Sequence, residues 1–519
     1  MTAVPASADP CAANALARQL RAGARGRGAE VFADQPGRPP LSHDALWQGA
    51  ERMAAALVRA GVKPGDRVAV QTEKTLEAVQ LYLGALMAGA VFLPLNTAYV
   101  PAEIAYFLTD AEPAVFVCDP ARQAALAEAA GAVPQVLTLD AEGRGSLAEA
   151  AAAEAPGFAA VARGDDDLAC ILYTSGTTGR PKGAMLSHGN LASNAATLAE
   201  VWRFTPADRL IHALPIFHAH GLYVALNVTL TAGGSLIFLP KFDADAVIEA
   251  LPRATAMMGV PTFYTRLLDH PGLTRELCAG MRLFVSGSAP LLAETHRAWT
   301  ARTGHAILER YGMTETSMNA SNPYEGERRP GAVGFPLPGV ELRVCGPDGA
   351  VLGRGATGSL QVRGPNVFKG YWRMPEKTAE EFTADGFFIT GDLATVSEDG
   401  YFSIVGRAKD MVISGGYNVY PVEVEALIDA LPGVAESAVI GLPHPDFGEG
   451  VAAVVVGAPG EAPSPEAIMA ALRDRLAGYK RPRAVFVTDA LPRNTMGKVM
   501  KNVLRDTYRD AFAEGAAAG

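Results

Sequence analysis

Several features that would place a chain in other protein classes are missing from this sequence. The five cysteines are widely spaced and form no metal-ligand pattern, so we expect neither a disulfide framework nor a zinc site. No apolar run reaches the roughly 18 residues of a membrane span, and residues 1–10 lack the basic and apolar segments of a signal peptide. A net charge of −10 argues against nucleic-acid binding. These absences predict a cytoplasmic protein with reduced cysteines.

The composition and the alternation of elements are those of a multidomain α/β protein. With 519 residues, of which 49% are hydrophobic and 19% charged, the chain is too long for one core and has a globular composition. Apolar segments typical of buried strands alternate with segments of helical periodicity, which predicts parallel sheets covered by helices. The expected helices are 45–60, 75–88 and 101–110, and the expected strands are 67–71, 91–95 and 114–118.

The pattern changes twice in the C-terminal part of the chain. From about Val333 to Val405, short apolar segments alternate with glycine-rich turns, which predicts a β-rich subdomain of hairpins. Beyond Arg407, a strand candidate and a glycine pair are followed by helical segments at 421–431 and 465–477. We therefore predict a large domain at residues 1–407 and a small, mobile α+β domain at residues 408–519.

A loop rich in glycine and hydroxyl residues is the most informative motif. It follows the apolar strand candidate 168–173 and reads Thr174, Ser175, Gly176, Thr177, Thr178, Gly179, Arg180, Pro181, Lys182 and Gly183. Glycines let backbone N–H groups approach an anion, hydroxyls add donors, and Lys182 adds a positive charge, so the loop suits a polyphosphate. It is not a Walker A loop, because Arg180 and Pro181 stand before the lysine and Gly183 follows it.

This loop resembles the signature of the acyl-adenylate-forming superfamily, which includes acyl-CoA synthetases, firefly luciferases and the adenylation domains of peptide synthetases. The resemblance continues over nearly the whole chain and in the same order. It implies a ligase that uses ATP and Mg²⁺ to convert a carboxylic acid into an acyl-adenylate, and then transfers the acyl group to coenzyme A (CoA).

The resemblance also implies an ATP site. Tyr311 would stack on the adenine, Thr314 would bind phosphate, and Glu315 would hold Mg²⁺ as a hard oxygen ligand. Asp392 would accept hydrogen bonds from the ribose, and Arg407 would contact ribose and phosphate. The other residues that the resemblance assigns to ATP are Ser288, Ala289, Pro290, Glu309, Arg310, Gly312 and Met313.

Lys498, near the C-terminus, resembles the catalytic lysine of the family. Its ammonium would bridge the substrate carboxylate and the α-phosphate, assisted by Thr174, Glu315 and His218. Acetylation of Lys498 by a lysine acetyltransferase would remove that charge. The resemblance further implies a hinge at Lys409 and a loop lining the CoA channel at Ser414, Gly415, Gly416 and Tyr417.

The identity of the acid depends on three pocket segments, 217–221, the helix after 260–262, and 286–289. Arg266 in that helix is either an ordinary exposed residue or the partner of a second substrate carboxylate, with His220 and Ser286 assisting. The chain most resembles the malonyl-CoA synthetases of the family, so we expect malonate, and some use of methylmalonate. The alternatives are another short-chain or aromatic acid, delivery to a carrier protein, and a nucleotide-binding regulator without activity.

Overall fold

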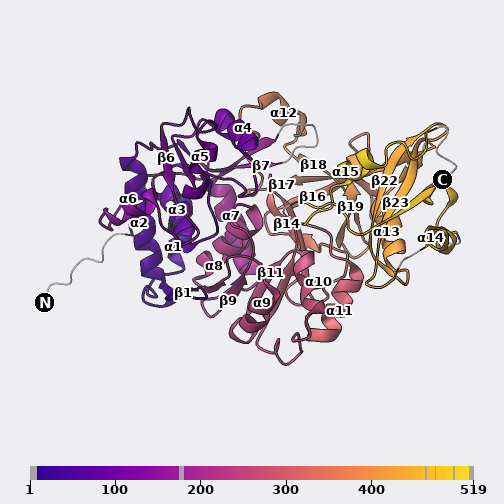
Figure 1. Cartoon of the computed structure of the whole chain (residues 1–519), viewed down its shortest axis with the longest axis horizontal. Helices are drawn as coiled ribbons and strands as arrows, with labels where there is room; N and C mark the ends of the chain where they lie inside the picture. Colours follow the sequence, from indigo (N-terminus) through magenta and orange to yellow (C-terminus); the bar gives the residue numbers. More distant parts are fainter. Residues whose placement is uncertain are drawn as a thin grey trace.

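The computed structural model describes residues 9–174, 181–415, 417–461, 464–473, 475–494 and 497–513. This part of the chain forms four β-sheets with helices packed against them, which confirms the predicted α/β class. In Figure 1 the chain runs from the N-terminal sheets (indigo and purple) to the C-terminal sheet (yellow) on the opposite side.

The first sheet has helices on both faces. Its strand order is β6-β5-β3-β4-β7-β8, and all neighbours are parallel except β7 and β8. Val68 and Val70 contribute to the core beneath α2 and α3, whereas Ala69 contributes to the core beneath α4, as expected for alternating strand residues. The strands are β3 (Arg67–Gln71), β4 (Val91–Pro94), β5 (Val115–Cys118), β6 (Gln135–Thr138), β7 (Leu168–Thr174) and β8 (Lys182–Ser187).

The helices predicted for this region are confirmed to within about two residues. Ser42 and Thr75 cap the first two, because each side chain accepts a hydrogen bond from a backbone N–H of the first turn. The helices of this sheet are α2 (His43–Arg59), α3 (Leu76–Met87), α4 (Pro101–Ala111), α5 (Pro120–Leu126) and α6 (Ser146–Ala152).

The second sheet has nine strands in the order β15-β14-β13-β12-β11-β9-β10-β1-β2. Its strands from β13 to β1 are parallel, and β14, β15 and β2 are antiparallel to their neighbours. The strands are β1 (Val31–Asp34), β2 (Leu41–Ser42), β9 (Arg209–His212), β10 (Ser235–Phe238), β11 (Ala256–Gly259), β12 (Leu283–Ser286), β13 (Leu308–Met313), β14 (Ser317–Ser321) and β15 (Phe335–Pro336). The helices of this part of the chain are α1 (Ala15–Ala22), α7 (His188–Val201), a π-helix (His220–Leu226), α8 (Asn227–Ala232), α9 (Ala244–Ala250), a 3₁₀ turn (Leu251–Arg253), α10 (Pro261–Asp269) and α11 (Ala293–Thr303).

The predicted β-rich subdomain is the third sheet, an antiparallel meander. It comprises β16 (Glu341–Cys345), β17 (Thr357–Arg363), β18 (Phe388–Val396) and β19 (Phe402–Arg407), with the short helix α12 (Pro375–Glu380) between β17 and β18. A 3₁₀ turn, Ala408–Asp410, follows β19 directly. The turn occupies the position at which we predict the domain boundary.

The fourth sheet is built only from residues after this turn. Its strands are β20 (Val412–Ser414), β21 (Tyr417–Val419), β22 (Val434–His444), β23 (Gly448–Gly457) and β24 (Ala484–Thr488), and its helices are α13 (Pro421–Asp429), α14 (Pro465–Leu472), a 3₁₀ turn (Gly478–Lys480) and α15 (Lys501–Thr507). The expectation of a helix extending to residue 477 is wrong, because α14 ends at Leu472 and the chain then turns toward the 3₁₀ segment.

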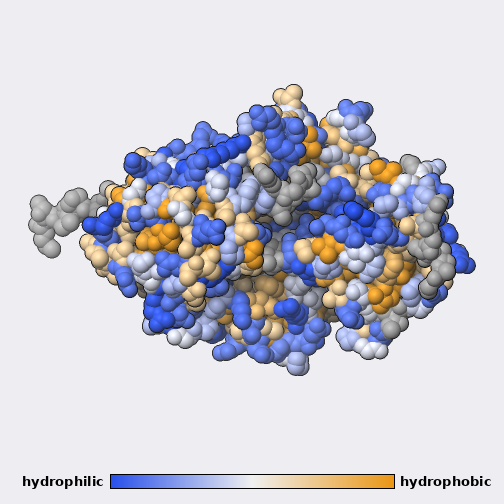
Figure 2. All heavy atoms as spheres, turned by 45° about the horizontal axis from the view of Figure 1, so that its top comes forward, coloured by the Kyte–Doolittle hydropathy of each residue, from blue (hydrophilic) through white to orange (hydrophobic). Residues whose placement is uncertain are grey.

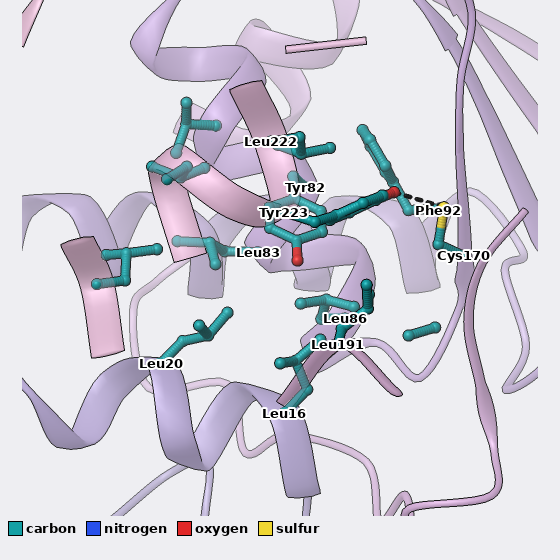
Figure 3. Close-up of a cluster of buried hydrophobic side chains, with 14 of the residues drawn as sticks. Leu16, Leu20, Tyr82, Leu83, Leu86, Phe92, Cys170, Leu191, Leu222 and Tyr223 are labelled. Atoms are coloured by element: carbon teal, nitrogen blue, oxygen red, sulfur yellow. Dashed lines mark hydrogen bonds between the residues drawn. The ribbon is translucent and has the colours of Figure 1, made fainter. Parts of the chain in front are cut away.

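Figure 3 shows part of the largest hydrophobic core, in which α1, α3, α7 and β7 meet. Leu16 and Leu20 of α1 pack in the same cluster as Leu83 of α3. The hydroxyl of Tyr223 donates to the sulfur of Cys170, so this buried hydroxyl is paired within the core. All five cysteines are buried and free, as expected of small apolar residues.

Hydrophobic residues on the face shown in Figure 2 form separate patches among hydrophilic ones. Within the described ranges, no helix is both long enough and apolar enough to cross a membrane.

Candidate active site

The carboxyl ends of the parallel strands in the nine-stranded sheet collect the predicted pocket segments. The segment 217–221 follows β9, which ends at His212, and the segment 260–262 follows β11, which ends at Gly259. The segment 286–289 begins at Ser286, the last residue of β12. β13 ends at the same edge and continues into Glu315. Ligands of α/β proteins bind at this edge, so sequence-distant residues converge there.

The phosphate loop joins two strands at the edge of the first sheet. Thr174 at the end of β7 pairs in register with Lys182 at the start of β8, and the Thr174 hydroxyl lies 3.5 Å from the Lys182 carbonyl oxygen. The antiparallel pairing therefore brings the two ends of the loop together. The remaining predicted phosphate ligands, Ser175, Gly176, Thr177, Thr178 and Gly179, lie outside the described residues.

Tyr311, Asp392 and Arg407 meet beside β13. The Tyr311 hydroxyl donates to Asp392 Oδ2, across 81 positions of sequence, and Asp392 Oδ1 lies 2.5 Å from Arg407 Nε. Strand pairing places Asp392 of β18 directly opposite Arg407 of β19. Burial is the largest single effect and opposes the charge on Arg407, but Asp392 and the other acidic groups nearby together outweigh it and raise the pKa of the guanidinium. The structure thus joins the predicted adenine and ribose residues into one cluster.

Glu315 is a buried carboxylate in the turn that follows β13. Burial raises its pKa, while the Tyr371 hydroxyl, Arg407 and Lys182 favour its charged form. No cluster of three or more His, Cys, Asp or Glu side chains able to hold a metal occurs among the described residues. A single carboxylate fits Mg²⁺, which keeps several waters and is commonly bound by one or two carboxylates together with substrate phosphates. Glu315 therefore suits a metal that arrives with a nucleotide.

The loop that carries Lys498 is docked against the large part of the molecule. A Cβ added at Gly497 would lie 3.4 Å from the Thr262 hydroxyl at the start of α10. The side chain of Lys498 reaches solvent, yet the surrounding protein and Arg407 lower its pKa, against the opposing effect of Asp392 and Asp410. The charges of Asp392 and Arg407 thus act on Lys498, although these residues are far apart in the sequence.

The predicted hinge and CoA residues lie on the side of the fourth sheet. Lys409 is in the 3₁₀ turn, and the adjacent Asp410 pairs with Arg505 of α15 at 2.5 Å. Ser414 is buried, Gly415 has a positive φ of 59°, and Tyr417 is 60% exposed. Gly416 lies outside the described residues. The roles of these residues in rotation and CoA binding remain predictions.

Three polar side chains of the predicted acid pocket lie close together: His220 is buried, and His218 and Ser288 are half-buried. His220 Nδ1 lies 3.2 Å from the Ser288 hydroxyl, and the backbone N–H of His220 donates to His218 Nδ1 at 3.4 Å. Burial, reinforced by Arg310, lowers the pKa of His218 to about 4 and holds that of His220 well below its usual range. Both imidazoles are therefore neutral near pH 7. Ser286 is also buried, and its hydroxyl has no partner among the described residues.

Arg310 is the most unusual residue of the site. It is 4% exposed, and its Nε and Nη2 atoms have no hydrogen-bond partner in the described part of the chain. Its guanidinium packs onto Gly287, where a Cβ would lie 2.3 Å from Arg310 Cζ. Burial lowers the pKa of Arg310 to about 9. Buried charges in proteins are normally paired, so this guanidinium indicates a site for an anion.

Strand geometry separates Arg310 from the ATP cluster. Successive side chains of β13 point to opposite faces, so Arg310 lies opposite to Glu309 and Tyr311. Tyr311 reaches Asp392, whereas Arg310 lies against Gly287 and influences His218. The sequence analysis assigns Arg310 to ATP, and that contact stays a prediction; the alternation of strand residues is the signal that places its side chain on the other face of β13 from Tyr311. Ala289 and Pro290, also expected at ATP, lie beyond Ser288 at this edge.

Arg266, the residue predicted to bind a second carboxylate, is exposed on α10. The neighbouring Tyr264 and Leu267 face the core, and this leaves Arg266 on the outer face of the helix. The described residues give Arg266 no hydrogen bond or ion pair, so the geometry favours the first of the two interpretations, an ordinary surface arginine.

Comparison with known proteins matches this geometry. A family model described as AMP-binding enzyme matches residues 20–372, and the model of the AMP-binding enzyme C-terminal domain matches residues 423–498. The chain belongs to the AMP-binding enzyme family. Its similarity to known acid–CoA ligases identifies it as an AMP-forming acid–CoA ligase. A feruloyl-CoA synthase of an Amycolatopsis species is 40% identical over 480 residues, which cover 91% of this chain and 95% of the relative. A malonate–CoA ligase of Arabidopsis thaliana is 35% identical over 484 residues, which cover 87% and 79%.

A solved structure of this family extends the comparison to three dimensions. ATP-bound MatB from Rhodopseudomonas palustris is 58% identical and superposes with a TM-score of 0.93, covering 96% of this chain and 100% of that one. The apo form of the same protein superposes with a TM-score of 0.84. The ligase described here is therefore more similar in overall arrangement to the ATP-bound form, in agreement with the docked position of the Lys498 loop.

Proposed function

We propose that this ligase activates malonate and forms malonyl-CoA, with AMP and pyrophosphate as the other products. The observation that carries the proposal is the buried, unpaired guanidinium of Arg310. An aromatic or long-chain acid requires an apolar pocket, in which an uncompensated charge costs several kcal/mol. A second carboxylate on the substrate would instead pair with Arg310 through two parallel hydrogen bonds.

The names of the relatives do not by themselves select the acid. Malonate–CoA ligases from Arabidopsis thaliana, Bos taurus and Mus musculus are 35%, 36% and 37% identical to the chain, whereas the feruloyl-CoA synthase is 40% identical. The polar side chains of the pocket favour the dicarboxylic acid. Neutral His218 and His220 and the Ser288 hydroxyl offer hydrogen bonds to a carboxylate without adding charge.

The proposed first step is the transfer of the adenylyl group. One carboxylate oxygen of malonate attacks the α-phosphorus of ATP, the bond to the pyrophosphate oxygen breaks, and the mixed anhydride forms. Asp392 holds the ribose, Tyr311 faces the adenine, and Lys498 neutralises charge that develops between carboxylate and α-phosphate. Bound Mg²⁺ would supply charge neutralisation at the phosphates, with Glu315 as its protein ligand.

The proposed second step is thioester formation. The sulfur of CoA attacks the acyl carbon of the adenylate, the acyl–oxygen bond breaks, and AMP leaves. Lys498 is docked for the first step, so the second requires the residues after Arg407 to move. We propose Lys409 as the pivot of this movement, with Ser414 to Tyr417 lining the thiol channel afterwards, and a domain boundary at residues 407 and 408.

A substrate panel tests this function. Pyrophosphate release is followed with malonate, methylmalonate, acetate, benzoate and ferulate, each with CoA present and omitted. We expect malonate to give the highest kcat/KM, and sustained turnover only when CoA is present. A preference for ferulate or benzoate would overturn the malonate proposal and favour an aromatic acid ligase. Adenylation of malonate without thioester formation would point to a carrier protein as the acceptor, and no release with any acid to a regulator without activity.

A further inference from the structure

A short strand-like segment holds the lysine strand of the phosphate loop in place. The segment around Gly370 and Tyr371 pairs with β8, where Met185 N–H donates to Gly370 O and Trp372 N–H donates to Gly183 O at 2.7 Å. The segment leads into α12, whose C-terminal cap is Glu381. Glu381 therefore contacts Lys182, the lysine of the loop, although the two residues are 199 positions apart in the sequence.

Glu381 contacts two groups of the site with its two oxygens. Oε1 accepts from the Lys182 ammonium at 2.9 Å, and Oε2 accepts from the Tyr371 hydroxyl at 2.7 Å. The Lys182 ammonium also lies 4.0 Å from the centroid of the Tyr371 ring, in the position of a cation–π contact. Lys182 and Glu381 are 13% and 21% exposed at their side chains, so water weakens this ion pair less than one on the surface.

The Tyr371 hydroxyl continues the connection to Glu315. It lies 3.0 Å from Glu315 Oε1, and Tyr371 is 2% exposed. A hydroxyl has one proton, so it donates to one carboxylate at a time. Glu381 is thus joined to Lys182 directly and to Glu315 through a single buried hydroxyl.

We propose that Glu381 is a positioning residue of the ATP site, which fixes the Lys182 ammonium beside the phosphate loop and, through Tyr371, the orientation of the Glu315 carboxylate. The inference rests on the proposed roles of Lys182 and Glu315 toward ATP and Mg²⁺. It adds a residue that touches neither ligand and connects the cation meant for the phosphates with the carboxylate meant for the metal.

The plain alternative is that Glu381 only forms a surface ion-pair cluster with Lys182 and Lys377. Lys377 lies 3.3 Å from Glu381 Oε1, and its own pair with Glu380 at 3.0 Å is exposed. Although burial opposes its charge, Lys182 and Tyr371 hold the pKa of Glu381 below the ordinary value, so the carboxylate stays charged near pH 7. A surface ion-pair cluster does not explain the contacts on the buried side, in which the Tyr371 hydroxyl lies between Glu381 and Glu315.

The test compares Glu381→Gln with Glu380→Gln, its neighbour in sequence. Both remove one negative charge, but only Glu381→Gln removes the charged contact to Lys182 and presents an amide N–H₂ to Tyr371. MgATP affinity is measured by calorimetry without any acid, at several Mg²⁺ concentrations. We expect Glu381→Gln to weaken MgATP binding about tenfold and to raise the Mg²⁺ requirement, and Glu380→Gln to stay within about twofold of wild type.

A double-mutant cycle separates positioning from a loss of structure. If Glu381 acts through Lys182, Glu381→Gln should have less than about a twofold effect on ATP affinity in the Lys182→Ala background. Tyr371→Phe, which keeps the ring, should raise the Mg²⁺ requirement and leave the melting temperature close to wild type. If Glu381 only stabilised the fold, the coupling to Lys182 in ATP affinity and the raised Mg²⁺ requirement would not occur together at a nearly unchanged melting temperature.

The outcomes distinguish the inference from the function on which it rests. Equal behaviour of Glu381→Gln and Glu380→Gln, or additive losses in the Lys182→Ala background, would overturn the inference while the ligase proposal stands. A wild-type protein that binds no MgATP would overturn the proposed ATP roles of Lys182 and Glu315, and with them both conclusions.

Discussion

Replacing Arg310 by methionine should separate malonate recognition from the rest of the reaction. Methionine fills the space of the arginine stem but cannot pair with a carboxylate. Burial lowers the pKa of the guanidinium to about 9, well below its ordinary value, which means that burial disfavours its charged form by several kcal/mol. A substrate carboxylate that pairs with the guanidinium offsets part of this cost of burying the charge. Removing one partner of such a buried pair costs about 2–5 kcal/mol.

The expected result is a large and selective loss. We expect Arg310→Met to lower kcat/KM for malonate by about 30-fold to 1000-fold, corresponding to 2–4 kcal/mol, and to change kcat/KM for acetate far less. Because the ligand-free protein no longer buries an unpaired charge, its melting temperature should rise rather than fall. The assay is pyrophosphate release with both acids, together with thermal unfolding without substrates.

Arg266→Met is the matched control, because it removes the same charge from an exposed position. If Arg310 binds the second carboxylate, the control should keep malonate use within about twofold of wild type. If Arg266 binds it, the two variants exchange behaviour. Equal losses for malonate and acetate in Arg310→Met, or a malonate-to-acetate ratio unchanged from wild type, would refute the argument from the unpaired guanidinium.

The Arg310 guanidinium should also make stability and malonate binding depend on pH. The folded pKa of Arg310, about 9, is lower than the unfolded one. Above about pH 9 the unfolded chain therefore holds more protons, and the contribution of Arg310 to the free energy of unfolding rises with pH until the unfolded arginine also loses its proton. Malonate binding has the opposite sign, since it needs the charged form. KM for malonate should therefore rise above about pH 9 in the wild type, and a flat profile there would contradict the assignment.

Three further variants test the remaining assignments. Lys498→Ala should lower adenylation by about 10²–10³-fold and spare thioester formation from supplied malonyl-adenylate; equal loss in both half-reactions would exclude the role. Lys409→Pro should spare pyrophosphate exchange, for which the Lys498 loop is already docked, and cripple thioester formation; loss of both would contradict the hinge. Asp392→Asn, which removes the charge beside Arg407, should raise KM for ATP about tenfold and leave KM for malonate nearly unchanged; a change in malonate KM alone would oppose the ribose assignment.

The fold was largely predictable because local patterns decide helices and strands. Periodicity located α2, α3 and α4 to within about two residues, and turn glycines marked the antiparallel sheet. The end of α14 was not predictable in the same way, since the helical spacing of apolar residues continues from Leu472 to Leu476, whereas the helix ends at Leu472.

In the candidate site, too, local sequence motifs identified some features, and the tertiary structure was needed for the others. The sequence by itself determined which chemical groups are present: a loop from Thr174 to Gly183 predicted to bind polyphosphate, a carboxylate at Glu315 and a lysine at 498, each recognisable within a few consecutive residues. Only the tertiary structure decided which arginine is buried without a partner, because exposure and pairing depend on elements distant in the sequence. It placed Arg266 on the outer face of a helix and Arg310 against Gly287.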